Sequence, residues 1–506
     1  MFWLRNKVSL HPALAIVFWL ACGWLEAAPA VSGSVVVSPE AELYRLTALA
    51  LERNPQVVAA RHEVERYVAL RDELKGFFDP QLKAAGQGQQ DGVAGQDGFL
   101  STAGTAMALQ PGAYLDLQAG QNYLNHLSAN YPDQMAQTIF TARLRVPLNR
   151  DRGFVTWKLD DQRAAVEARA AGARLLAACQ TVRREVDLRY VTLCAAQASF
   201  EVAAAASRRA VKLLDETREM VRLKVVPEYQ VYPAQYEVAV RRENEMTAVQ
   251  AIGTASLRLA ETLAAPVAVG TAIEAVSGTP MVIVWAEGMS LPVAPPLSKA
   301  LAARGNWRDV QGRADATRLE IRRNQEGLKS NVAVIVEGGW QGEEQSGMVG
   351  SGVYTFERNF GGLVGLTWSR PLGYQAERAR VRQAAAQLAE LEATGREVEL
   401  AVRTEVETAR RDYEQARERL RVLSDAVAAA RLTLEAEEQR FRLGEGRSRN
   451  VLDAQKDLNE VVSRQTIVAG ELLVAVARFH YATGYQYATS NGLLAMTTIK
   501  PQSDEY

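Results

Sequence analysis

A run of regularly spaced apolar residues between Val381 and Leu434 most strongly limits what this chain can fold into. The spacing alternates steps of three and four and advances 53 residues in 15 steps, or 3.53 residues per step. This lies close to the coiled-coil period and predicts one very long helix. Many of these residues are small, which lets neighbouring helices approach closely. The predicted buried positions are Val381, Ala384, Leu388, Leu391, Gly395, Val398, Val402, Val406, Ala409, Tyr413, Ala416, Leu420, Leu423, Val427, Ala430 and Leu434.

The chain also repeats itself. FRLGEGRSRNVLDAQ at 441–455 aligns with VRLKVVPEYQVYPAQ at 221–235, an offset of 220 residues, and the text around Pro371 aligns with that around Pro147 at an offset of 224. Near Asn54 and Asn306 the offset is 252, so it falls by 28 across the segment between these alignments. The first repeat therefore carries a longer hairpin insertion, placed within Asp91–Met135, whose Gly-, Asp- and Asn-rich text is typical of loops.

Segment lengths predict how the helices are arranged. In the first repeat, residues 41–77 and 230–264 together match the length of the long helix predicted at 153–222. In the second, residues 297–329 and 451–484 together match the long helix at 374–441. Two short helices stacked end to end would thus run beside each long helix of about 100 Å. Strands would lie at one end of this rod and helical turns at the other.

Short amphipathic segments between the helices predict strands. In Gln137–Leu148, Phe140, Ala142, Leu144 and Val146 alternate with polar residues that include Arg143 and Arg145. Asp79–Gln90, Asn331–Trp340 and Gly361–Arg370 complete about four strands per chain. Strands of this length with one apolar and one polar face fit a transmembrane β-barrel, although a soluble sheet gives the same alternation. Aromatic residues suited to the membrane interfaces are Phe99, Tyr114, Tyr123, Trp340, Phe356, Phe360 and Trp368.

The N-terminus has the layout of a secretory signal. Arg5 and Lys7 precede an apolar run, and the small residues Ala28 and Ala30 follow, so we expect cleavage after Ala30. The alternative is lipoprotein processing before Cys22. The expected organisation is a signal peptide at 1–30, a first repeat at 31–269, a Gly- and Pro-rich linker at 270–296, a second repeat at 297–486 and a tail at 487–506.

Composition argues against several functions. Lys and Arg total 58 against 59 for Asp and Glu, so the net charge of −1 gives no general attraction to nucleic acid. His62, His126 and His480 are scattered without the spacing of metal ligands, and no Gly-rich phosphate loop links a strand to a helix. We therefore expect no catalytic site, no metal and no cofactor.

Four strands cannot close a barrel, and open strand edges cannot lie in lipid. The chain is therefore expected to oligomerise, and three copies would give about twelve strands around an aqueous lumen.

In this arrangement the chain resembles the outer-membrane efflux protein family, the TolC-like channels. The resemblance rests on the duplicated plan, on the pairs Pro147-Leu148 and Pro371-Leu372 at strand exits, and on a turn motif in the second repeat. That motif consists of Phe441, Gly444, Ser448 and the run Val451-Leu452-Asp453-Ala454. The resemblance implies a mainly α-helical homotrimer in the cell outer membrane, with a 12-stranded β-barrel continued by a long α-helical barrel into the periplasm. It further implies a passive exit duct for an inner-membrane pump, joined through a periplasmic adaptor protein.

The resemblance also assigns roles to the turn residues. Gly444 would permit a tight turn, and Val451 and Leu452 would begin the helix that returns from it. By motif position Asp453 and Asn450 face the lumen, and Arg447 or Arg449 would supply a counter-charge; a helix-end carboxylate stabilised by the helix dipole is the alternative for Asp453. In the first repeat Gln230 stands at an acidic position and Lys224 at that of the glycine. The adaptor-contacting residues would be Phe441, Gly444, Ser448, Val451, Leu452, Ala454, Leu223, Val231 and Ala234.

A second function remains open from the sequence: a periplasmic coiled-coil adaptor or interaction protein without a pore. It would explain the helices and turns. However, an adaptor has one helical hairpin between β-rich halves, whereas here the helices return twice, each time beside amphipathic strands.

Overall fold

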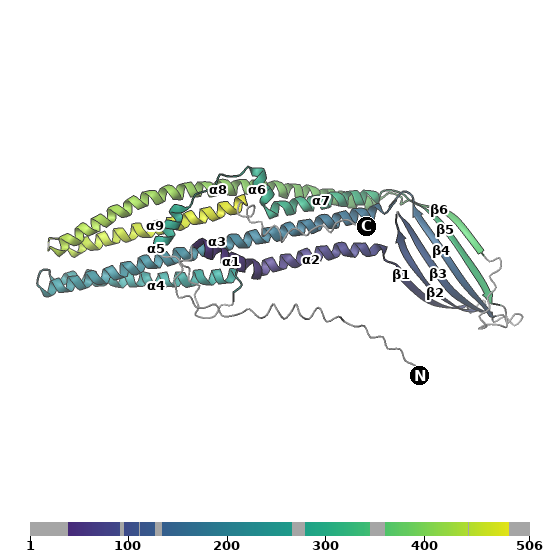
Figure 1. Cartoon of the computed structure of the whole chain (residues 1–506), viewed down its shortest axis with the longest axis horizontal. Helices are drawn as coiled ribbons and strands as arrows, with labels where there is room; N and C mark the ends of the chain where they lie inside the picture. Colours follow the sequence, from purple (N-terminus) through teal and green to yellow (C-terminus); the bar gives the residue numbers. More distant parts are fainter. Residues whose placement is uncertain are drawn as a thin grey trace, which may run out of the picture.

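The computed structural model is a rod of long helices capped at one end by a twisted sheet (Figure 1). It describes residues 39–91, 96–110, 112–126, 134–265, 279–344, 360–443 and 445–484. The expected signal peptide, Cys22 and the C-terminal tail lie outside the described residues. The α-helices are α1 (Pro39–Arg53), α2 (Pro55–Lys75), α3 (Val155–Arg222), α4 (Val231–Thr262), α5 (Thr279–Gly288), α6 (Leu297–Ala303), α7 (Gly305–Glu326), α8 (Gln375–Arg442) and α9 (Ser448–Thr483). Two short 3₁₀ helices are η1 (Gly76–Phe78) and η2 (Glu228–Gln230).

Two helices of 68 residues, α3 and α8, run the length of the rod, about 100 Å at helical rise. The short helices stack end to end beside them: α2 continues into the line of α4, and α7 into that of α9 (Figure 1). Near the sheet the helices pack side by side in the order α2, α3, α7, α8, and toward the turns in the order α4, α3, α9, α8. The helical body is therefore four helices wide near the sheet and near the turns, and α1, α5 and α6 pack on these helices between the two regions.

The predicted heptad positions of α8 face its neighbours. All sixteen, from Val381 to Leu434, are buried or half-buried, while the intervening charged residues are mostly exposed. On α3 the core side chains Val182, Val186, Tyr190 and Leu193 are completely buried. The long helix predicted from the apolar spacing is therefore confirmed. Its stability comes mainly from packing against neighbouring helices rather than from intrinsic helix propensity.

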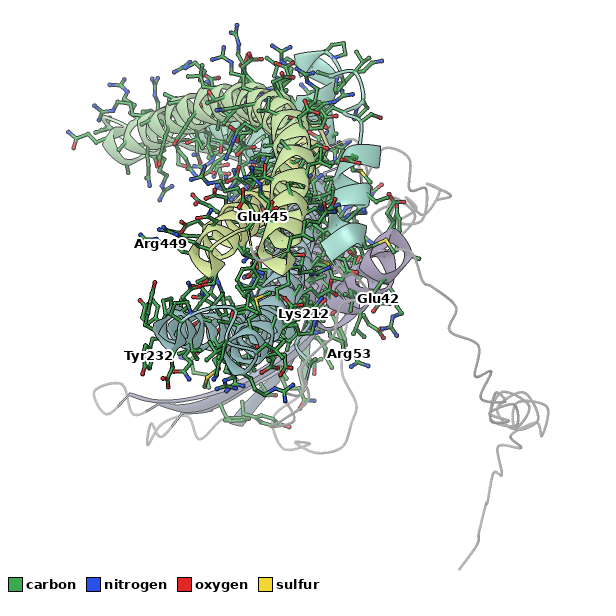
Figure 2. The ribbon with its side chains drawn as sticks, turned by 90° about the vertical axis from the view of Figure 1, so that its left-hand side faces the viewer. Glu42, Arg53, Lys212, Tyr232, Glu445 and Arg449 are labelled. Atoms are coloured by element: carbon green, nitrogen blue, oxygen red, sulfur yellow. The ribbon has the colours of Figure 1, made fainter. Side chains whose placement is uncertain are left out.

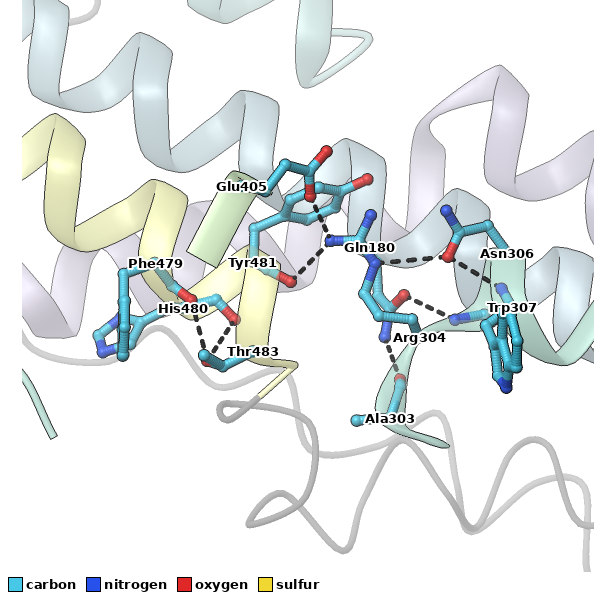
Figure 3. Close-up of polar contacts among 11 residues, drawn as sticks. Gln180, Ala303, Arg304, Asn306, Trp307, Glu405, Phe479, His480, Tyr481 and Thr483 are labelled. Atoms are coloured by element: carbon cyan, nitrogen blue, oxygen red, sulfur yellow. Dashed lines mark hydrogen bonds and ion pairs between the residues drawn. The ribbon is translucent and has the colours of Figure 1, made fainter. Parts of the chain in front are cut away.

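At mid-length, polar side chains hold the breaks between the short helices. In the first repeat, Asn54 caps α2 and donates from Nδ2 to the carbonyl of Thr262 (2.9 Å), at the end of α4. In the second, Arg304 lies between α6 and α7 and donates from Nη1 to the carbonyl of Tyr481 (3.1 Å) and to Glu405 Oε2 (3.0 Å), as Figure 3 shows. Each clasp ties the end of a return helix to the start of the helix that continues its line.

The sheet contains β1 (Gln81–Asp91), β2 (Gln96–Leu109), β3 (Ala113–His126), β4 (Gln134–Pro147), β5 (Asn331–Glu344) and β6 (Phe360–Ser369). All neighbours are antiparallel, in the order β1-β2-β3-β4-β5-β6. The expectation of about four strands per chain is wrong, since the described residues form six. The insertion expected within Asp91–Met135 lies where predicted, but β2 and β3 occupy most of it. Its glycines, alanines and amide residues are typical of loops, but here they form strands. These strands are stabilised by hydrogen bonds to neighbouring strands on both sides.

An aromatic cluster joins the sheet to the helices. Phe154, which immediately precedes α3, is 2% exposed and packs edge-to-face against Phe77 and Tyr114, with ring centroids 5.2 and 5.1 Å away. Trp157 donates from Nε1 to the carbonyl of Leu74 (2.8 Å). Strand and helix directions are thus fixed relative to each other at this junction.

A buried carboxyl group, Asp187, and a half-buried imidazole, His480, lie near Arg183 and predict a pH dependence of stability. Burial raises the pKa of Asp187 to about 6, against the opposing effect of Arg183, and its Oδ1 has no hydrogen-bond partner among the described residues. Burial, aided by Arg183, lowers the pKa of His480 to about 4. Asp187 contributes fully to the free energy of unfolding below its ordinary pKa of 3.8, and this contribution is lost as pH rises through 6. His480 contributes fully above its ordinary pKa of 6.5, and its contribution is lost as pH falls through 4.

Asp187→Asn should therefore separate these opposing contributions. Relative to wild type, we expect the variant to gain stability between pH 4 and pH 7, by about 3 kcal/mol at most, because a shift of one pKa unit corresponds to about 1.4 kcal/mol. Thermal unfolding of both proteins at pH 4 and pH 7, followed by helical circular dichroism, measures the difference. Equal differences in unfolding temperature at the two pH values would contradict the assignment.

Candidate functional site

The two helical turns lie together at the end of the rod opposite the sheet. The first joins α3 to α4 and the second joins α8 to α9 (Figure 1). Figure 2 looks at this end and shows Tyr232 beside the first turn and Glu445 and Arg449 at the second. A direct contact links the turns, because Ser448 Oγ donates to Gln230 Oε1 (3.2 Å). This hydrogen bond thus connects the turn of the first repeat to the turn of the second.

The second turn is closed by its own backbone. The amides of Glu445 and Gly446 both donate to the carbonyl of Arg440 (3.0 and 3.1 Å). A Cβ on Gly446 would lie 3.0 Å from the amide nitrogen of Phe441, so the chain passes close to the helix end there. Gly444, to which the sequence assigned the turn, lies outside the described residues.

The first turn is closed by an equivalent backbone hydrogen bond, but a lysine rather than a glycine occupies its left-handed position. The amide of Val225 donates to the carbonyl of Met220 (2.9 Å), and Lys224 is held at φ 57°, in the left-handed region. A side chain there costs about 1 kcal/mol relative to glycine. The alignment at an offset of 220 places Lys224 opposite Gly444.

Lys224→Gly should consequently stabilise the first turn by about 1 kcal/mol, since glycine adopts this conformation without steric cost. Lys224→Ala is the matched control, because it removes the charge and keeps the Cβ. Limited proteolysis of this turn measures the effect. We expect slower cleavage in the glycine variant alone; equal slowing in both variants would attribute the effect to the lysine charge.

Apolar side chains under the turns are well buried. Phe441 and Val451 are each 1% exposed and pack with Ala454 and Leu458 between α8 and α9, with Leu452 at the edge of this cluster. Under the first turn, Ala234 is completely buried and packs with Ala210, Leu214 and Val238, with Val231 at the edge. Leu223, by contrast, is exposed.

The charged residues assigned to the turns are at the surface. Asp453 lies 4.0 Å from Arg449, one helical turn away, and both side chains are largely exposed. Such an exposed pair contributes little to stability. Arg447 precedes the first residue of α9 and is exposed, as is Asn450. In a single chain the Asp453 carboxylate is therefore accessible to solvent and to neighbouring copies or ions.

Strand register gives the sheet one apolar and one polar face. The alternation predicted for Gln137–Leu148 is confirmed, because Phe140, Ala142 and Leu144 share a face with apolar residues of every other strand. Large side chains on this face stay exposed in the single chain: Leu82, Phe99, Leu117, Tyr123, Phe140, Val336, Trp340, Phe360, Val364, Leu366 and Trp368. An exposed apolar surface spanning six strands is unusual for a soluble monomer.

Charged and polar residues occupy the opposite face. Asp116, Arg143 and Glu337 stand directly opposite one another on β3, β4 and β5, and Arg143 Nε lies 2.9 Å from Glu337 Oε2. The sequence placed Arg143 on a polar face but missed this row, because its members come from strands far apart in the chain. On the same face, a Cβ on Gly104 would lie 2.3 Å from the carbonyl oxygen of Leu117. Glycine there allows the close approach that bends the sheet toward its polar side.

The expected aromatic residues fall mostly on the apolar face. Phe99 pairs with Tyr123, and Trp340 with Phe360, toward the end of the sheet far from the helices, while Trp368 lies near the helices. Tyr114 instead lies on the polar face, in the aromatic junction, so its assignment to a membrane interface is wrong. Phe356 lies outside the described residues.

None of the helices in the described part of the chain is long and apolar enough to cross a membrane. Within the same residues, no three His, Cys, Asp or Glu side chains are grouped as metal ligands would be.

Comparison with known proteins gives one family and one fold. The family described as outer membrane efflux protein matches residues 297–485, the second repeat. No curated protein sequence matches the chain. Among solved structures, VceC of Vibrio cholerae is 16% identical with a TM-score of 0.62, covering 88% of this chain and 96% of its own. The open state of MtrE of Neisseria gonorrhoeae is 16% identical with a TM-score of 0.63, covering 87% and 88%. CmeC of Campylobacter jejuni is 11% identical with a TM-score of 0.63, covering 96% and 93%.

These likenesses extend over nearly the whole described chain and agree with the duplicated helices, the turns and the amphipathic sheet. The three solved structures are described as outer membrane channels or an outer membrane protein. The chain thus carries a match to the outer membrane efflux protein family in its second repeat and shares, over both repeats, the fold of these solved structures.

Proposed function

We propose that this protein is the outer-membrane exit duct of a tripartite export assembly, passive in itself and open at its sheet end to the cell exterior. The observation that carries this function is the six-stranded sheet with one largely apolar, exposed face. Such a face suits hydrocarbon, and the polar face then borders water. The helical rod would then extend into the periplasm.

Open edges on both layers support a closed homotrimer. Among the described strands, β1 and β6 each have an edge that pairs with no other strand, which lipid does not tolerate. At one margin of the helical layer, α4 exposes Tyr232, Tyr236, Met246 and Leu257 on the side opposite its buried residues. At the other margin, α8 exposes Leu400, Val422 and Leu432. A ring of identical copies would join the two margins and both strand edges at once, and the family supports three copies.

The helical turns would form the periplasmic end of this ring. Asn450 and Asp453 lie in the first two turns of α9 and would approach the threefold axis, with Arg449 and Arg447 beside them. Three carboxylates around one axis repel one another and attract cations, so they form an electrostatic constriction.

Asp453→Ala should then enlarge the current through single channels, because it removes the three charges nearest the axis. Asp457→Ala is the control, since it deletes an exposed carboxylate one helical turn farther from the end. Planar-bilayer recordings of both variants beside wild type measure the effect. Equal currents in all three would make Asp453 a carboxylate that only stabilises the helix end.

The adaptor of the assembly would dock at the turns. Phe441, Ser448, Val451, Ala454 and Ala234 are buried in the single chain, so they would shape the docking surface from beneath. The exposed side chains of the turns, among them Leu223, would make the contact itself. Gly444 belongs to this proposal by motif position. An inner-membrane pump would supply the energy through the adaptor.

The alternative, an adaptor without a pore, gains no support from the fold, because it would leave the apolar face of the sheet in water. Membrane fractionation tests the choice. An exit duct should sediment with outer-membrane markers, resist a high-salt and carbonate wash, and require detergent for extraction. Release into the soluble periplasmic fraction would overturn the proposal.

A further inference from the structure

The two repeats contribute unequally to the sheet. The first supplies β1 to β4 and the second only β5 and β6. The additional pair, β2 and β3, is bonded into the wall along its full length: β2 pairs with β1 from Asp91 to Gln81, and β3 pairs with β4 from Tyr114 to Asn125. This hairpin is therefore part of the barrel wall rather than a flap upon it.

The width that β2 and β3 add to the sheet can be compared with the width of the helical layer in the same chain. Strands spaced about 4.8 Å apart and tilted by about 40° each occupy about 6.3 Å of a barrel's circumference, so six strands cover about 38 Å. Four helices at interaxial distances of about 8–10 Å cover about 32–40 Å. Four strands would cover only about 25 Å on the same basis. With β2 and β3 included, sheet and helical layer have the same width within one chain.

The edges of the widened sheet remain compatible with ring closure. β1 runs away from the helices and β6 returns toward them (Figure 1). Because the number of strands is even, β6 of one copy lies antiparallel to β1 of the next. Every described strand keeps its alternation of apolar and polar faces in the ring, so the lipid face stays continuous around the barrel.

We propose that the β2–β3 hairpin widens the barrel, so that three copies close an eighteen-stranded barrel of the same girth as the twelve-helix duct below it. This inference rests on the proposed trimer. The barrel would measure about 36 Å between strand axes, against about 24 Å for twelve strands, since diameter grows with strand number. The sheet end then adds no narrowing, and the turns at the opposite end form the constriction of the whole duct. Solutes as broad as the helical lumen pass the outer membrane without a second filter.

Polar side chains support a wide, wet lumen at this end. The row of Asp116, Arg143 and Glu337 would occur three times around the wall, near the junction with the helices. Opposite charges alternate along the row, and Arg143 is paired with Glu337 at 2.9 Å. Because the row pairs within each copy, it lines the lumen without needing contacts across it, as expected of a barrel with an open centre.

Electron cryomicroscopy of the full-length protein, extracted in detergent, tests the proposal directly. We expect a threefold ring with eighteen strands and a barrel as wide as its helical duct. A threefold ring with twelve strands and β2–β3 outside the wall would overturn this inference and leave the exit duct intact. A twofold ring, in which two copies supply twelve strands, would overturn the eighteen-stranded barrel and the proposed trimer. A soluble monomer would instead overturn the proposed function.

A deletion variant gives an independent measurement. Removing residues 96–126 joins β1 to β4 through a short loop and leaves two antiparallel strands in the first repeat. Poly(ethylene glycol) of graded size, added on the extracellular side during bilayer recording, reports the largest polymer that enters the barrel. We expect the cut-off radius to fall by about 6 Å in the deletion variant, following the change from eighteen to twelve strands. An unchanged cut-off in folded trimers would show that the hairpin does not set the width.

Discussion

Val364→Arg is expected to abolish assembly of the protein in the outer membrane. Val364 lies midway along β6 on the apolar face and is 79% exposed in the single chain. An arginine near the middle of the bilayer on the lipid face of a barrel costs about 2–4 kcal/mol, and three copies incur it three times. Because the whole apolar face depends on contact with lipid, we expect loss of the detergent-resistant oligomer on gels of outer-membrane extracts.

The neighbouring residue provides a matched control. Leu363 lies on the polar face, directly opposite Glu337 on β5. Leu363→Arg introduces the same side chain one position away, but into the lumen and beside an opposite charge, which is a favourable cross-strand pair. We expect it to assemble normally. If both variants assembled, or if both failed equally, the assignment of the two faces would be wrong.

The second large effect is expected for Arg304→Ala. The Arg304 side chain is 3% exposed, and its guanidinium donates to Glu405 and to the carbonyl of Tyr481 while lying 4.0 Å from the centroid of the Tyr481 ring (Figure 3). Truncation leaves a buried carbonyl without this donor and a void at the junction of α6, α7 and α9. Because Glu405 is half-exposed, the main loss comes from the buried donor and its packing, and leaving a buried polar group without its partner costs about 1–3 kcal/mol. Thermal unfolding followed by circular dichroism should show a clear decrease in melting temperature.

Two variants identify the cause of this loss. Arg304→Lys keeps the charge but loses the planar fork of donors and the stacking on the tyrosine ring, so we expect an intermediate loss. Glu405→Gln leaves an acceptor for the guanidinium in a half-exposed position and should cost little. A melting temperature of Arg304→Ala equal to wild type would show that the clasp does not hold the helices together.

The helical body was largely predictable from the sequence. Long helices packed in a layer require apolar residues at heptad spacing, and the seam from Val381 to Leu434 displays them without interruption. The repeat at an offset of 220 likewise places the two turns at one end, where Ser448 and Gln230 meet. The apolar periodicity is visible in the sequence because the helix contacts that require it recur every few residues. The duplication is visible because the two repeats can be aligned directly.

The strand number was not predictable in the same way. β2 and β3 contain Gly98, Gly104 and Gly120, together with many small and amide residues, and such text resembles loops. These residues form strands because both sides of each strand are paired and because close backbone approach is needed where the sheet bends, as at Gly104. The row of Asp116, Arg143 and Glu337 and the clasp of Arg304 escape sequence reasoning for a related reason: their partners are distant in the chain.

The turns lie between these cases. The motif assigns Phe441, Val451 and Ala454 to contact with an adaptor, and the structure places them together in one cluster. The motif does not show that these residues are buried in a single chain, or that Lys224 occupies a left-handed conformation suited to glycine. Both facts depend on the backbone closure of each turn rather than on residue type. The role of Asp453 depends on neighbouring copies and stays a prediction.

The central claim is that copies of this chain enclose one continuous pore. Single-channel recording of the purified, detergent-extracted wild-type protein in planar bilayers tests it most directly. We expect discrete, uniform current steps that are small because the periplasmic turns restrict the pore, together with a trimeric mass for the same preparation. A soluble, monomeric protein that produces no current steps would contradict it.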